Sequence, residues 1–246
     1  MSNLLIDIGN SEIKIGKGNF KNYSVRLIKR SAYSKTNFEK DFKNIVQNLI
    51  AENSFDKAGI CLPKDRNEKF LESYFIRNFN IKPVFINRKL KLPIKINYSE
   101  GIGNDRICNA VAANKIYQSK NILIIDFGTA TTYTLVLNNS LIGGMISPGI
   151  KTSLNSLSVN TSLPIVNLNF PKKIINNNTI DNIKAGILYQ TLFAVEKVIS
   201  ELKKTTKELY VIGTGGYSNL ISKKTMAINK VDRNLILKGI NIILSE

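Results

Sequence analysis

Three glycine-rich segments each follow an apolar run in this 246-residue chain: residues 7–11 (DIGNS), 126–131 (DFGTAT) and 213–216 (GTGG). A glycine turn after a buried strand leaves backbone N–H groups free to face an anion. One such turn alone is also explained by ordinary turn formation. Together the three favour a site that holds phosphate groups, the first two as phosphate-clamping hairpins and the third as an adenosine-side loop. The sequence contains neither GxxxxGK[ST] nor GxGxxG, which disfavours P-loop and Rossmann-type nucleotide sites.

Three aspartates accompany these glycines. Asp7 and Asp126 end their apolar runs, and carboxylates there could help to hold a cation or a magnesium nucleotide, although a turn-capping role is the alternative. Asp105 lies in residues 101–106 (GIGNDR) at the predicted start of a helix, where an N-cap is the alternative. Beside Arg106 it also suits a substrate pocket, with the carboxylate accepting a hydroxyl hydrogen bond and the guanidinium holding an anionic group.

The composition excludes several kinds of chemistry. The chain has no histidine, so hydrolases and zinc sites that need an imidazole are excluded, and acid–base work must fall to Asp, Glu, Lys or Tyr. Two cysteines, Cys61 and Cys108, form no C-x-x-C pair, which disfavours a redox or zinc role. The net charge of +17 could attract anionic substrates or nucleic acid. Scattered lysines, no tryptophan and no zinc-finger spacing argue against nucleic acid, and a general compositional bias explains the charge as well.

The class is that of an ordinary globular protein, because 43% of the residues are hydrophobic and the mean hydropathy is −0.06. No segment approaches the roughly 18 uninterrupted apolar residues that a membrane span needs. The N-terminus MSNLLIDIGN has no basic region followed by an apolar stretch and a cleavage site. We therefore expect a cytoplasmic protein with no membrane partner.

The elements that must position these residues repeat once along the chain. Residues 3–16 and 121–136 each read as an apolar strand, an Asp-x-Gly turn and a second, antiparallel strand, and the two Asp-x-Gly units lie 119 residues apart. This spacing predicts an internal duplication of two α/β halves, residues 1–118 and 119–246. The absence of a low-complexity linker predicts that the halves pack together.

Periodicity predicts the remaining elements. Helical patterns cover residues 36–52, 66–78, 105–119, 180–204 and 232–244, and another helix follows the turn cluster 143–149. Short apolar runs predict strands at 58–62, 84–86 and 209–212. Residues 88–100 show little periodicity and are predicted to form a basic loop.

The motifs taken together resemble one family. DIGNS, GNDR (103–106), DFGTATT (126–132), GGMISPG (143–149), NTIDNIKAG (178–186) and GTGG occur in the order typical of type III pantothenate kinases. The resemblance implies two duplicated ribonuclease-H-like domains with mixed β-sheets flanked by helices, as in the actin-like ATPase superfamily. It also implies ATP-dependent phosphorylation of pantothenate to 4′-phosphopantothenate, the first step of coenzyme A synthesis, with Mg²⁺ and a monovalent cation, K⁺ or NH₄⁺.

The resemblance further implies a role for each matching residue. Asp105 would be the general base, Asp126 would bind the monovalent cation, and Thr179 would reach the substrate across a homodimer interface. Pantothenate would be lined by Tyr98, Gly103, Asn104, Asp105, Arg106 and Thr179. ATP would be held by Asp7, Ile8, Gly9, Asn10, Ser11, Glu12, Ile13, Lys14 and Thr129.

The sequence also departs from the family pattern. The spacer between Tyr98 and the GNDR motif is about two residues shorter than usual, Thr134 stands where many members carry Asp, and residues 58–64 (AGICLPK) lack a common Ser-Val-Val-Pro. Loss of the Asp could weaken cation affinity. Two other functions stay open at this point: a non-catalytic regulator related to accessory factors of toxin transcription, and another small-molecule kinase on the same fold.

Overall fold

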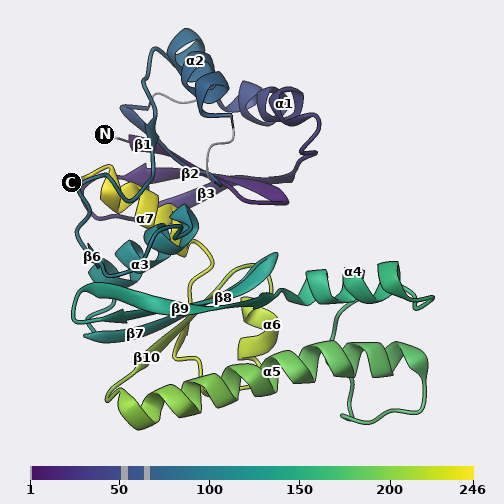
Figure 1. Cartoon of the computed structure of the whole chain (residues 1–246). Coiled ribbons are helices and arrows are strands. Elements are labelled where there is room, and N and C mark those ends of the chain that lie inside the picture. The colour runs from purple at the N-terminus through teal and green to yellow at the C-terminus, as the bar shows by residue number, and fades with distance from the viewer. Residues whose placement is uncertain (1, 51–54, 64–66) are drawn as a thin grey trace. The chain divides into compact units, whose positions relative to one another are not determined.

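The computed structural model of the chain describes residues 2–50, 55–63 and 67–246 (Figure 1). It divides into two compact units. The first comprises Met1–Gln118 and Asn234–Glu246, and the second comprises Ser119–Arg233. In the part of the chain that is described, no helix is both long enough and apolar enough to span a membrane.

The first unit is built on a five-stranded sheet in the order β3-β2-β1-β4-β5. β1, β2 and β3 are antiparallel neighbours, whereas β1, β4 and β5 run parallel to one another. The strands are β1 (Ser2–Ile8), β2 (Glu12–Asn19), β3 (Val25–Ala32), β4 (Lys57–Cys61) and β5 (Val84–Phe85), and a further two-residue strand is β6 (Lys95–Ile96). The helices are α1 (Phe38–Ile50), α2 (Glu68–Phe79), α3 (Asn104–Ile116) and α7 (Leu235–Ile243).

Alternation along β1 decides which side chains face which helices. Leu4, Ile6 and Ile8 enter a core shared with α1 and α2. Asn3 and Asp7 therefore point to the opposite face, where α7 packs, and the Asn3 side-chain amide donates a 2.9 Å hydrogen bond to Asn241 of α7. In Figure 1, α1 and α2 lie on one side of this sheet and α3 and α7 on the other. Asp7 is thus placed on the α3–α7 face at the end of its strand.

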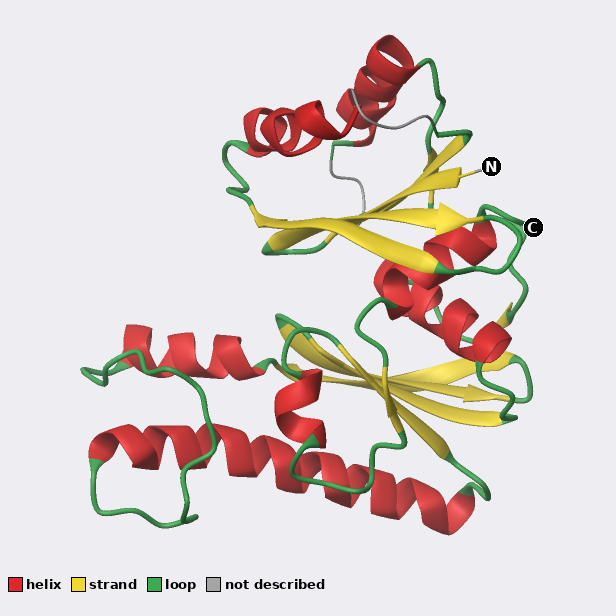
Figure 2. Ribbon diagram, turned by 180° about the vertical axis from the view of Figure 1, so that it is seen from behind, coloured by secondary structure: helices red, strands yellow, loops and turns green. Residues whose placement is uncertain are grey.

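The second unit contributes five strands in the order β11-β10-β7-β8-β9. They are β7 (Asn121–Phe127), β8 (Ala130–Leu137), β9 (Ser140–Pro148), β10 (Tyr210–Thr214) and β11 (Lys230–Val231). The helices are α4 (Ile150–Asn160), α5 (Thr179–Thr205) and α6 (Ser218–Ser222). Figure 2 shows α5 running along one face of the sheet. Leu123, Ile125 and Phe127 pack in the core that this helix covers.

Most of the predicted elements are confirmed. Both hairpins form, and the predicted helices 36–52, 66–78 and 105–119 appear as α1, α2 and α3 with slightly different ends; residues 51, 52 and 66 lie outside the described part. The predicted helices 180–204 and 232–244 appear as α5 and α7. The sequence did not predict β3, β11 or α6, and the predicted loop 88–100 contains β6. The predicted turn cluster 143–149 was wrong, because all of it except Gly149 lies in β9.

The C-terminal tail packs with the first unit, although the repeat had placed it in the C-terminal half. The reason is the composition of α7, whose residues Leu235, Ile240 and Ile242 are all fully buried. Every residue of α7 except Lys238 is buried, and such a helix needs cover on several sides. Here α3 and the first sheet provide it, and a Cβ on Gly239 would overlap the backbone of Cys108.

Candidate functional site

Asp7 occupies the end of β1 and is only 3% exposed. It lies directly opposite Lys14 of β2 in the antiparallel register. The Lys14 ammonium is 3.0 Å from a carboxylate oxygen of Asp7 and 3.6 Å from Glu12. A buried carboxylate needs such a partner, because an unpaired charge away from water is costly.

The turn after Asp7 is closed by backbone contacts. The Gly9 N–H donates to the Glu12 carbonyl at 2.9 Å, and the Tyr33 hydroxyl donates to the Gly9 carbonyl at 2.7 Å. Asn10 and Ser11 are exposed at its tip. Of the residues predicted to hold ATP, Ile8 and Ile13 direct their side chains into the core with α1 and α2. They can therefore face a phosphate only through their backbone.

Asp105 lies in the first turn of α3, with Gly103 as the preceding cap residue. One of its carboxylate oxygens accepts a 2.8 Å hydrogen bond from the N–H of Arg106. Asp105 is exposed to solvent. Desolvation by the surrounding protein nevertheless raises the pKa of Asp105, and the hydrogen bond from the Arg106 N–H lowers the pKa in part. The negative charge of Asp7 raises the pKa further. A carboxylate that is open to a ligand and has a raised pKa is suited to accept a proton.

Arg106 is buried, and Tyr98 holds its guanidinium. The guanidinium carbon lies 5.1 Å from the centre of the Tyr98 ring, and Nη1 donates to the Tyr98 hydroxyl at 3.3 Å. The structure therefore brings Tyr98 beside the GNDR motif in spite of the short spacer. Asn104 is used differently, since its side-chain amide donates to the carbonyl of Leu62 at 3.0 Å and ties α3 to the end of β4.

Both cysteines lie near these acids. Cys61 is the direct neighbour of Asp7 in the parallel register of β1 and β4. A hydrogen bond with Cys108 and desolvation raise the pKa of the Cys61 thiol well above its usual value, and the charges of Asp7 and Asp105 add to this. Cys61 therefore stays protonated near neutral pH, and it serves as packing beside the acids rather than as a nucleophile.

In the second unit, Asp126 is the penultimate residue of β7 and is paired with Thr214 of β10 in the parallel register. Gly215 follows with φ of +86°, and its Cα lies so close to Asp126 that a Cβ would collide with the carboxylate. The neighbouring hairpin turn is closed by a 3.1 Å bond from the Gly128 N–H to the Ala130 carbonyl. These contacts leave a cradle of backbone around Asp126 that only glycine permits.

Thr129 contacts the start of one helix of this unit, and Thr179 begins another. The Thr129 carbonyl accepts from the N–H of Gly149, the residue before α4, at 3.1 Å. Thr179 is the first residue of α5, which Asn178 caps by accepting from the Asp181 N–H at 2.9 Å. Thr179 also lines a cavity of about 630 Å³ between α4 and α5.

The sequence-predicted site residues thus form two groups. The first unit brings together the hairpin around Asp7 with Asp105, Arg106 and Tyr98, and the second brings Asp126 together with Thr129 at one edge of its sheet. Sequence reasoning missed Tyr33, which fixes the first turn, and Thr152, whose hydroxyl donates to the Thr129 carbonyl. Neither residue lies in a motif, so no local signal could have identified it.

The side chains that could bind a metal ion can be compared with the ligands that Mg²⁺ requires. Among the described residues, no three Asp, Glu, Cys or His side chains cluster as a ready-made metal site. Mg²⁺ bound with a nucleotide commonly uses one or two carboxylates together with phosphate oxygens and water. The buried, strand-end carboxylate of Asp7 fits that mode, and a closed metal cage does not fit.

Comparison with known proteins gives three results. The sequence model of the family described as type III pantothenate kinase matches residues 3–201. A type III pantothenate kinase of Petrotoga mobilis is 32% identical over 247 residues, which cover 96% of this chain and 95% of that protein. Two solved structures share the fold at low identity: a Baf family transcriptional activator from Campylobacter jejuni (17% identity, TM-score 0.62, 98% and 96% of the two chains) and a ROK family glucokinase from Streptomyces griseus (10% identity, TM-score 0.54, 99% of each).

Proposed function

The chain belongs to the type III pantothenate kinase family, and from this premise we propose that it transfers the γ-phosphoryl group of ATP to pantothenate, the first step of coenzyme A synthesis. The observation that carries the proposal is Asp105, a solvent-accessible carboxylate of raised pKa beside the buried Arg106, in a chain that matches the family from residue 3 to 201. Its fold is the one seen in actin-like sugar kinases. We expect the enzyme to work in the cytoplasm.

Asp105 would act on the substrate alcohol. Its carboxylate accepts the proton of the primary hydroxyl while the hydroxyl oxygen attacks the γ-phosphorus, and the bond to the β-phosphate oxygen breaks to release ADP. The raised pKa of Asp105 brings its proton affinity closer to the working pH, which improves a general base. Arg106, with its guanidinium fixed by Tyr98, would hold the substrate carboxylate.

The two glycine turns would hold the nucleotide. Backbone N–H groups around Gly9 and the ammonium of Lys14 would face phosphate oxygens, and Thr129 would contact ATP from the second hairpin. Magnesium bound with the nucleotide supplies charge neutralisation, for which Asp7 offers a carboxylate. Asp126, in its glycine cradle, is the residue proposed to bind K⁺ or NH₄⁺. These residue roles are supported by their placement at strand ends and by their match to the family motifs.

A panel of alcohols tests the proposed substrate. The purified protein is given Mg-ATP with pantothenate, glucose, N-acetylmannosamine or glycerol, and products are identified by mass spectrometry. We expect a phosphorylated product with pantothenate alone, because a fixed Arg106 suits an acceptor that carries a carboxylate. A product with a neutral sugar and none with pantothenate would assign the chain to another kinase activity on this fold.

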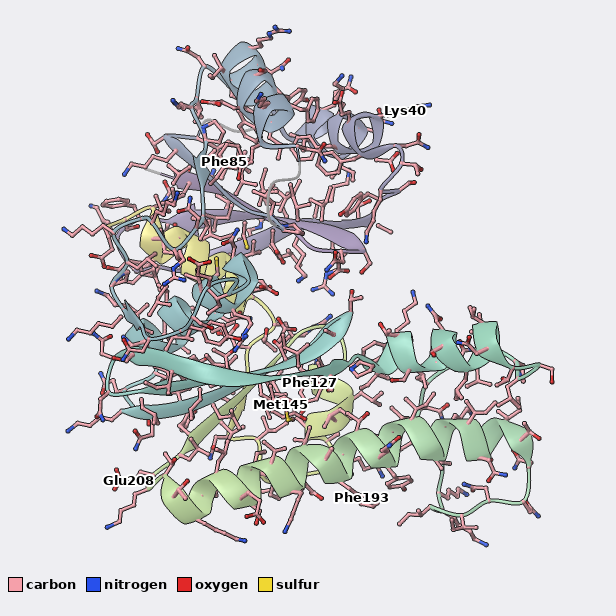
Figure 3. The ribbon with its side chains drawn as sticks, viewed as in Figure 1. Lys40, Phe85, Phe127, Met145, Phe193 and Glu208 are labelled. Carbon is pink, nitrogen blue, oxygen red and sulfur yellow. The ribbon has the colours of Figure 1, made fainter. Side chains whose placement is uncertain are left out.

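The surface of the second unit supports a homodimer. Ile174, Ile175 and Phe193 are 52%, 83% and 48% exposed, and they line one apolar cavity of about 590 Å³ with residues of α5. Figure 3 shows Phe193 on the side of α5 that faces away from the sheet. Exposed apolar side chains gathered in this way are typical of an interface. The adjoining cavity contains Thr179, so a second copy seated there would lie beside a proposed substrate residue.

Phe193→Asp is expected to separate the dimer. A buried charge at an apolar interface costs several kcal/mol, so the dissociation constant should rise by about 100-fold or more. Light scattering after size exclusion measures the mass. Met226→Asp is the matched control, because Met226 is 98% exposed and does not line this cavity. A dimer that survives Phe193→Asp unchanged, or a wild-type chain that elutes as a monomer, would contradict the proposed interface.

A further inference from the structure

Four charged side chains lie on one face of the first hairpin and the neighbouring strand β3. The register places Asp7 of β1 opposite Lys14 of β2, and Lys14 opposite Arg30 of β3. Glu12 lies two residues before Lys14, so its side chain points to the same face of the sheet. Ile13 and Ile15 point to the other face, into the core with α1 and α2. The row therefore reads carboxylate, ammonium, guanidinium, with a second carboxylate beside the last two.

The distances show how these charges share partners. Lys14 lies 3.0 Å from Asp7 and 3.6 Å from Glu12, and the Nε of Arg30 lies 3.8 Å from the same Glu12 oxygen. The Asp7 contact is therefore the close one, and both contacts of Glu12 are longer than a hydrogen bond. Within the described residues, the buried Nε of Arg30 has no hydrogen-bond partner. Glu12 thus has two cationic side chains nearby, and neither lies within hydrogen-bond distance of its carboxylate.

Like charges on directly opposed strand positions repel each other, and Lys14 and Arg30 stand in that relation. Glu12 offsets the repulsion without holding Lys14 away from Asp7. Asp7 and Lys14 have side chains that are only 5% and 14% exposed, so their attraction is weakly screened by solvent. A cation that binds the Asp7 oxygen contacted by Lys14 must therefore displace the ammonium, and the displaced ammonium needs another carboxylate or an anion within reach.

We propose that Glu12 is a positioning residue that receives Lys14 when Asp7 engages a magnesium-bound nucleotide, and that Arg30 competes with Lys14 for the same Glu12 oxygen. The inference rests on the proposed nucleotide role of the hairpin: Lys14 still faces the phosphates, with Glu12 in place of Asp7 as its carboxylate partner, and the role of Glu12 itself changes. Glu12 is not a phosphate ligand, since a carboxylate aimed at phosphate oxygens would repel them. Its role is to lower the cost of separating Lys14 from Asp7.

Calorimetry of ADP binding, with and without Mg²⁺, tests the proposed role of Glu12 without any turnover. In the wild-type protein Mg²⁺ should strengthen ADP binding. In Glu12→Gln we expect that strengthening to fall by about tenfold, the order of one partly buried ion pair. Glu12→Asp keeps the charge and should recover part of the loss. Arg30→Gln leaves Glu12 to Lys14 alone, so the strengthening by Mg²⁺ should equal or exceed that of the wild type.

The opposite results would overturn the inference. If Glu12→Gln binds Mg-ADP as well as or better than the wild type, Glu12 does not receive Lys14. If Glu12→Gln and Arg30→Gln lose the same amount, the four charges form only a structural network. A wild-type protein that shows no strengthening of ADP binding by Mg²⁺ would also overturn it. Failure of the proposed substrate shows separately, as normal Mg-ADP binding without phosphorylation of pantothenate.

Discussion

We expect Asp105→Asn to lower kcat by about 100-fold or more. This is the range of rate loss that follows removal of a positioned general base. The amide keeps the size of the side chain but cannot take the proton of the attacking hydroxyl. The dissociation constant for ADP should change little, because Asp105 is assigned to the alcohol and not to the nucleotide. Steady-state kinetics and calorimetry on the same preparations measure the two quantities.

The pH profile supplies an independent check on Asp105. Desolvation and the charge of Asp7 raise its pKa above the ordinary Asp value, so the carboxylate gains its proton at a higher pH than a normal aspartate does. Because the base works only when ionised, kcat/KM of the wild type should fall as the pH is lowered through that raised pKa. Asp105→Asn should lack this acidic limb. Turnover close to the wild-type rate in the variant would refute the assignment of Asp105.

Gly215→Ala is expected to destabilise the second unit strongly. A Cβ at residue 215 would collide with the Asp126 carboxylate and lie 2.7 Å from the backbone of Phe127, and φ of +86° is itself unfavourable for alanine. Left-handed strain and overpacking together should lower the free energy of unfolding by about 2–4 kcal/mol. The displaced Asp126 should also raise the KM for Mg-ATP and weaken dependence on the monovalent cation.

Gly216→Ala is the matched control for this change. A Cβ on Gly216 meets nothing within 4 Å, and its φ is not in the positive range, so stability should stay within about 0.5 kcal/mol of the wild type. Urea denaturation of both variants gives the unfolding free energies. Equal stability of the two variants, with an unchanged KM for ATP, would mean that the contact between Gly215 and Asp126 is unimportant.

Local patterns predicted the parts of the fold that depend on neighbours in sequence. The two Asp-x-Gly hairpins are examples, because alternation and a glycine turn specify a strand, a turn and a strand without reference to the rest of the chain. The helix that begins at Thr179 is another, since Asn178 caps it through a residue three positions later. The family motifs carried the candidate residues Asp105 and Arg106 in the same local way.

Contacts between distant residues could not be predicted. Tyr33 closes the turn at Gly9 from 24 positions away, and Asn241 pairs with Asn3 across 238 positions. The tail joins the first unit because every residue of α7 except Lys238 is buried, which a repeat-based division of the chain does not reveal. The position of Glu12 near Arg30 could not be predicted either, because it depends on the pairing of β2 with β3 and not on spacing in the sequence.

The most direct test of the central claim is the release of ADP from Mg-ATP by the purified protein, with and without pantothenate, in buffers whose only monovalent cation is K⁺ or Na⁺. Asp105→Asn serves as the blank for contaminating kinases. We expect release that depends on pantothenate, yields 4′-phosphopantothenate and is faster in K⁺. Release of ADP that is the same with and without pantothenate in both buffers would contradict the claim that this chain phosphorylates pantothenate.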